Sequence, residues 1–133
     1  MIDDPQLRPK IAAKTFGKMV SFNHFTMKAP VLIAIVREKQ TPFAKFGSVV
    51  KNKDFSSMDI GIAAEHFCIA AAEKGLGTCM LGWFNEKSVK KMLKVPSSKR
   101  IPLLISLGYP EDETISDKKR KQTDQMSSYN KYR

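Results

Sequence analysis

The sequence predicts an α/β (α+β) fold, with a central sheet flanked by helices. Two aliphatic runs, residues 29–36 and 101–107, contain almost no polar side chains, which is typical of strands buried on both faces of a sheet. Residues 59–74, which lie between them, are apolar over the length of a helix. Strands that need cover on both faces, and a helix that needs an apolar surface to pack on, together indicate this class.

Length and composition predict a single domain over residues 1–133. Hydrophobic residues make up 42% of the chain, as in ordinary globular proteins, but residues 111–133 are polar and form an extended C-terminal segment. We expect that segment to run over a surface of this chain or of a partner. No apolar run is long enough to span a membrane and no signal-peptide pattern opens the sequence, so we expect a cytoplasmic protein with no membrane partner.

The net charge of +10 and the two cysteines limit the class of function. Positive charge suits nucleic acid, an anionic membrane or a small anionic ligand, but the basic residues are spread along the chain except for the cluster 118–121. No motif interleaves basic and aromatic residues, so a nucleic-acid-binding module is the weaker alternative and we expect no nucleic-acid partner. Cys68 and Cys79 lack metal-ligand spacing, which predicts buried free thiols and no metal site; a disulfide would need an oxidising compartment.

Shorter elements complete the predicted sheet and its cover. Residues 3–20 are expected to form a helix, and residues 37–55 an excursion that carries Pro42, Gly47 and several lysines. After the long helix, residues 79–81 form a strand. A short helix over residues 86–93 follows, with Asn85 as its cap.

The long helix over residues 59–74 predicts a partner subunit. Ser56 and Asp59 form a plausible capping pair, and Gly75 ends the helix. Apolar residues cover almost its whole circumference, so it should be buried nearly all round, with His66 as a satisfied core residue. A chain this short cannot cover such a helix on every side, and we therefore expect a homodimer.

Four segments, in order, resemble the FMN-dependent nitroreductase family: residues 27–33, residues 59–67 with Ala70 and Ala71, residues 75–82, and residues 103–110 followed by the basic run 118–121. Together they cover about residues 2–121. The family usually begins with an Arg-x-Ser-x-Arg type helix and a Pro-Ser-x-x-Asn-x-Gln-Pro-Trp type segment, and neither occurs here. The chain resembles the C-terminal two-thirds of the family fold, a nitroreductase-like domain that lacks the usual N-terminal third.

This resemblance implies a flavoenzyme. Family members bind FMN at a dimer interface, take electrons from NAD(P)H as co-substrate, and pass them to a nitroaromatic, quinone or similar small-molecule acceptor. The flavin carries the chemistry, so no catalytic residue of the chain is expected. The alternative is a truncated or degenerate homologue that binds flavin without catalysis.

The resemblance assigns six residues to cofactor binding: Met80, Leu81, Gly82, Trp83, Lys118 and Arg120. The first four match the family loop whose backbone approaches the edge of the flavin ring, and Gly82 would allow that approach. Lys118 and Arg120 match the basic pair that contacts the FMN phosphate. On the residues alone, the glycine would be a conformational turn residue and the basic run a solvated surface.

Overall fold

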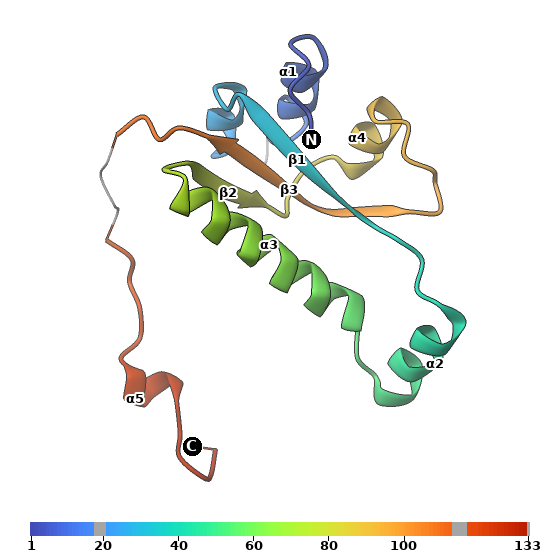
Figure 1. Cartoon of the computed structure of the whole chain (residues 1–133), viewed down its shortest axis with the longest axis vertical. Coiled ribbons are helices and arrows are strands. Elements are labelled where there is room, and N and C mark those ends of the chain that lie inside the picture. Colours follow the sequence, from blue (N-terminus) through green and yellow to red (C-terminus); the bar gives the residue numbers. More distant parts are fainter. Residues whose placement is uncertain (18–20, 113–116, 133) are drawn as a thin grey trace.

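The computed structural model describes residues 1–17, 21–112 and 117–132. Its elements, in chain order, are α1 (Leu7–Ala12), the 3-10 turn η1 (His24–Met27), β1 (Val31–Arg37), α2 (Pro42–Lys51), α3 (Phe55–Glu73), β2 (Gly77–Leu81), α4 (Glu86–Met92), β3 (Arg100–Gly108) and α5 (Thr123–Met126). The strands form one sheet, with α1 and α4 on one face and α3 on the other (Figure 1). This is the sheet flanked by helices that the sequence predicts.

The sheet is antiparallel, with β3 in the centre of the order β1-β3-β2. Its register shifts between Ile35 and Arg37, where residues 101 and 102 of β3 lie opposite a single residue of β1. Pro102 has no N–H to donate to a ladder, and such an irregularity is one of the few places where a central strand tolerates proline. All three strands lie where the aliphatic runs predict them, within a few residues.

The main core lies between the sheet and the helices α1 and α4. It is a cluster of buried side chains from the N-terminal segment, α1, all three strands and α4: Ile2, Ile11, Ala12, Leu32, Leu81, Val89, Ile101 and Leu104. The N-terminal segment joins the sheet through a bridge between Ile2 and Leu32. Since alternate residues of a strand face opposite sides, Ile105 is turned toward the other face, where α3 lies.

The helix α3 is confirmed, but its start and its burial differ from the prediction. Its cap is Asp54, whose carboxylate accepts hydrogen bonds from the N–H and hydroxyl of Ser57, so the expected pair of Ser56 and Asp59 is wrong. Gly75, at φ +70°, ends the helix as predicted, because a left-handed residue lets the chain turn and satisfy the last carbonyls.

The expected burial of α3 on all sides is wrong within one chain. Ala64 and Ala71 are its buried residues, and their small side chains let the helix lie close to the sheet. On the opposite side an apolar stripe stays exposed, formed by Phe55, Met58, Ile62 and Ile69. His66 is exposed as well, so the prediction of a core histidine is also wrong within the chain.

The segments before β1 and before α3 also depart from the prediction. The first helix spans only Leu7–Ala12, because Thr15 turns its hydroxyl back to the carbonyl of Ala12 and a buried polar cluster with Asn23 and Thr26 replaces further helical turns. Residues 18–20 of the predicted helix lie outside the described residues. The expected excursion contains α2, which Thr41 caps and which has proline at its first position.

The C-terminal segment extends away from the sheet. Residues 117–132 are exposed throughout, and α5 stands apart from the rest of the fold (Figure 1). We expected the segment to run over its own chain or over a partner; Glu111, at its start, pairs with Lys28, but residues 117–132 are not covered by the rest of the chain. Among the described residues, no helix combines the length and apolar composition needed to cross a bilayer.

Candidate functional site

The candidate cofactor loop joins the end of β2 to the start of α4. Leu81, the last residue of β2, is 3% exposed and belongs to the core, so it can offer a ligand only its backbone. Met80 points to the other face of the sheet and is 40% exposed, while Trp83 is 65% exposed. The loop therefore presents two large apolar side chains to solvent on either side of an exposed glycine.

Gly82 has no structural requirement for glycine within this chain. A Cβ built at Gly82 meets no atom within 4 Å, and its φ lies outside the left-handed range that favours glycine. Neither backbone conformation nor internal packing explains the residue. Open space beside an exposed backbone is what a planar ligand needs in order to approach closely.

Both ends of this loop are fixed by the fold. The N–H of Asn85 donates to the carbonyl oxygen of Lys14 over 2.8 Å, which ties the loop to the segment after α1. The side chain of Asn85 accepts a hydrogen bond from the N–H of Ser88 at 3.0 Å, as the sequence predicts for a helix cap. Because β2 holds one end and α4 the other, the loop backbone is preorganised.

Lys118 and Arg120 lie far from this loop within one chain. Both side chains are exposed and belong to the segment that leads into α5, well away from the end of β2 (Figure 1). The structure thus keeps Met80, Leu81, Gly82 and Trp83 together and leaves the two basic residues separate. A single site that uses both groups needs either a second copy of the chain or a different course of the C-terminal segment.

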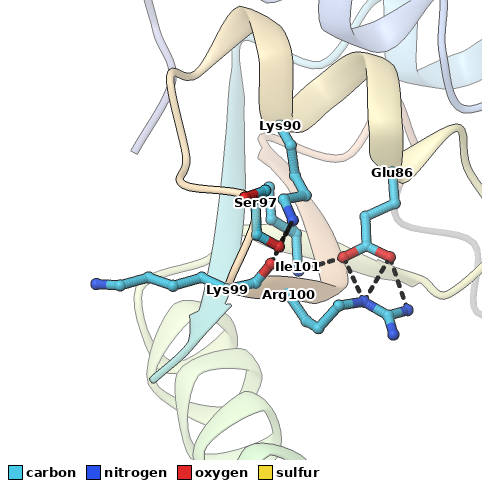
Figure 2. Close-up of polar contacts among 6 residues, drawn as sticks. All are labelled: Glu86, Lys90, Ser97, Lys99, Arg100 and Ile101. Carbon is cyan, nitrogen blue, oxygen red and sulfur yellow. Dashed lines mark hydrogen bonds and ion pairs between the residues drawn. The ribbon is translucent and has the colours of Figure 1, made fainter. Parts of the chain in front are cut away.

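An ion-pair cluster at the start of α4 has no signal in the local sequence pattern (Figure 2). The carboxylate of Glu86 accepts hydrogen bonds from Nε and Nη2 of Arg100, both at 2.8 Å, and from the N–H of Ile101 at 2.7 Å. The hydrogen bonds from Arg100 lower the pKa of the Glu86 carboxyl, and partial burial offsets some of that effect. The cluster joins the first turn of α4 to the start of β3.

We expect Glu86→Gln to destabilise the chain by about 1 kcal/mol at neutral pH, because it weakens a charge-assisted pair that is partly exposed. The pKa of Glu86 is lowered in the folded state, so its contribution is complete above the unfolded value of about 4.3 and is lost as pH falls through the folded value. Urea unfolding should therefore show a difference between parent and variant that shrinks below about pH 4. A constant difference from pH 7 to pH 3 would contradict this role for the carboxylate.

The cysteines offer no metal site. Both thiols are free, but Cys68 is only partly buried and Cys79 is exposed, so the prediction of two buried thiols is wrong within one chain. Partial burial of the sulfur, with the nearby Cys68, raises the pKa of the Cys79 thiol, which disfavours the thiolate that binds metals. Within residues 1–17, 21–112 and 117–132, no group of three or more His, Cys, Asp or Glu could hold a metal ion.

Comparison with known proteins identifies the family. The pattern described as "Nitroreductase family" matches residues 4–109, most of the chain. The chain belongs to the nitroreductase family. The resemblance seen in four sequence segments is therefore confirmed, and the matched region includes β2 and the loop with Gly82.

Individual relatives agree with the nitroreductase assignment. The chain is 26% identical to an iodotyrosine deiodinase of Thermotoga neapolitana over 88 residues. The matched region covers 66% of this chain and 41% of that protein. Its fold resembles that of a nitroreductase family protein from Clostridium novyi NT, with a TM-score of 0.65, 26% identity, and coverage of 85% of this chain and 61% of that one. An FMN-dependent nitroreductase from Clostridium difficile R20291 gives a TM-score of 0.73 and 22% identity, over 98% of this chain and 73% of that one.

The chain is shorter than these nitroreductase relatives. It spans 41% of the deiodinase and 61% of the Clostridium novyi protein. Membership of the family therefore does not by itself assign to this chain the activity of a whole member.

Proposed function

We propose that this chain binds FMN as a homodimer and transfers electrons from NAD(P)H to a nitroaromatic, quinone or similar small acceptor in the cytoplasm. One observation carries the proposal: Gly82, in the loop that matches the flavin-binding loop of the family, has open space beside its backbone that the fold itself does not require. The exposed Met80 and Trp83 flank that space. FMN, when bound, would supply the hydride and electron transfer.

The described residues fit the ring of FMN better than its phosphate. The loop after β2 is preorganised at both ends and offers backbone and apolar side chains to a flat ring. The phosphate needs cations, and Lys118 and Arg120 lie apart from that loop in one chain. We propose that the C-terminal segment runs over a second copy in the dimer, where it can complete a site.

The exposed stripe of α3 supports a second copy as the partner. Phe55, Met58, Ile62 and Ile69 follow one another along the side of α3 that faces away from the sheet. Large exposed apolar patches of this kind mark interaction surfaces in proteins. A self-complementary helix pair is the usual way in which two identical chains bury such a stripe.

The simplest test is the absorption spectrum of the purified protein after incubation with FMN and gel filtration. A retained flavin spectrum is expected, followed by NADH or NADPH oxidation that depends on a quinone. Retained flavin without turnover would favour the alternative, a degenerate flavin-binding homologue. No retained flavin from a folded dimer would overturn the proposal.

We expect Arg120→Ala to weaken FMN binding roughly tenfold, because a charge-assisted hydrogen bond to phosphate contributes about 1.5–3 kcal/mol and exposure reduces that value. Arg120→Lys should restore only part of the affinity, since lysine keeps the charge but lacks the planar fork of donors. Flavin fluorescence titration at low salt measures both variants. An Arg120→Ala protein that binds FMN as tightly as the parent would show that the basic run is only a solvated surface.

A further inference from the structure

The outer side of α4 forms an open pocket of about 350 Å³ with the turn that leads into β3. Its charged lining is one carboxylate and four cations: Glu86, Lys87, Lys90, Lys91 and Arg100. We call this surface the α4 pocket. It lies outside the loop with Gly82, and the proposed flavin site does not use it.

Two of its cations, Lys90 and Arg100, are held by hydrogen bonds, which Figure 2 shows. The ammonium of Lys90 donates to the carbonyl oxygen of Ser97 at 2.9 Å and to that of Lys99, which holds the turn against α4. Glu86 engages Nε and Nη2 of Arg100. The remaining Nη1 group of Arg100 has no hydrogen-bond partner among the described residues, so it is available to a ligand.

The other two cations have no acidic partner. Lys87 and Lys91 are exposed and stand four residues apart, which places them on the same side of α4. In the described part of the chain, no carboxylate lies within ion-pair distance of either. Like charges at this spacing repel one another and destabilise a helix. A bound anion would remove that repulsion.

A second, larger groove lies beside the α4 pocket and contains more carboxylates. It shares Arg100 and also contains cations, but Asp54 pairs with Arg37 at 3.1 Å. Glu38, which also lines it, pairs with Lys99. The larger groove contains two carboxylates among its five cations, whereas the α4 pocket contains one carboxylate among four cations, so the ratio of positive to negative charge is higher in the α4 pocket.

We propose that the α4 pocket binds a small molecule that carries linked phosphate groups. Several donors around one concave surface suit a multivalent oxyanion, with Arg100 supplying part of a planar fork and the lysines point charges. The volume lies within the range of small-molecule sites. No aromatic side chain lines the pocket, so it lacks the stacking platform on which single-stranded nucleic acids depend.

Isothermal titration of the protein with inorganic pyrophosphate tests the proposal without any flavin. Lys87→Gln and Lys91→Gln should each raise the Kd of pyrophosphate about fivefold, because each removes one partly screened cation. Lys94→Gln is the matched control, since it removes the same charge from the end of α4 but does not line the pocket. Unchanged Kd values for Lys87→Gln and Lys91→Gln would overturn the proposal, as would an equal loss for Lys94→Gln.

Titrations with two other ligands identify the ligand class. Sulfate should bind several-fold more weakly than pyrophosphate, and equal affinity for the two would overturn the requirement for linked phosphates. A single-stranded oligonucleotide that bound more tightly than pyrophosphate and lost affinity with the same two lysine variants would also overturn the assignment to a small molecule. Lys87 and Lys91 are exposed, so circular dichroism should show parent-like folding for both variants.

Discussion

Replacement of Ile62 by aspartate is expected to convert the proposed dimer of this chain into monomers at micromolar concentration. Ile62 and Ile69 are 58% and 57% exposed in one chain and lie two helical turns apart on the stripe of α3 that a second copy would cover. A buried, unpaired carboxylate at the centre of an interface costs about 2–4 kcal/mol, which is roughly 30- to 1,000-fold in the dimer Kd.

Light scattering after gel filtration, over a dilution series, measures this effect. Lys10→Gln is a matched control, because it changes the net charge by the same amount on an exposed site of α1, on the other face of the sheet. It should leave the dimer intact. A parent chain that is monomeric, or an Ile62→Asp chain that stays dimeric, would exclude α3 as the dimer interface.

The strands were predictable because their signal is local. Residues 29–36 and 101–107 are aliphatic and end at glycine, proline or charge, and β1 and β3 occupy nearly those positions. Their order in the sheet was not predictable, since it depends on which strands meet after the chain folds. The same holds for the pairing of Glu86 with Arg100, because no sequence spacing links residues fourteen apart in a helix and a strand.

The prediction of the helices was less complete, because a local sequence pattern does not show which surface will cover a helix. The composition of α3 indicates that all its sides need cover, but it does not say whether this chain or another provides it, and the structure shows one chain covering only the side with Ala64 and Ala71. The helix α2 had a signal that was missed: Thr41 and Pro42 form a helix start, and Phe43, Phe46 and Val50 follow at helical spacing.

The candidate site was predictable in part for a similar reason. Met80, Leu81, Gly82 and Trp83, at the end of β2 and in the loop after it, are contiguous, so their proximity needed no folding argument, and the resemblance to the family supplied their role. Lys118 and Arg120 are more than thirty residues further along the chain, and the course of the segment that carries them cannot be read from composition. Burial of Leu81 also escaped prediction, because a strand-end residue can face either side of the sheet.

Replacement of Gly82 by valine should abolish most FMN binding while leaving the fold intact. A Cβ at this position meets nothing within 4 Å and the backbone is not left-handed, so the chain itself tolerates a side chain. A flavin ring that approaches the backbone would instead meet an isopropyl group. Overpacking of that kind costs about 1–3 kcal/mol, which corresponds to roughly 5- to 150-fold in Kd. Gly82→Ala should give a smaller loss.

Flavin titration and thermal unfolding of the same samples separate a lost ligand contact from a damaged fold. Gly47→Val is the matched control, since a Cβ at Gly47 in α2 also meets nothing within 4 Å and this residue lies outside the loop after β2. Parent-like FMN affinity in Gly82→Val would mean that the flavin does not approach this backbone. A large drop in Tm for Gly82→Val would mean instead that the fold requires the glycine. We expect no such drop, because packing strain arises only where a new side chain meets other atoms, and a Cβ at Gly82 meets none within 4 Å.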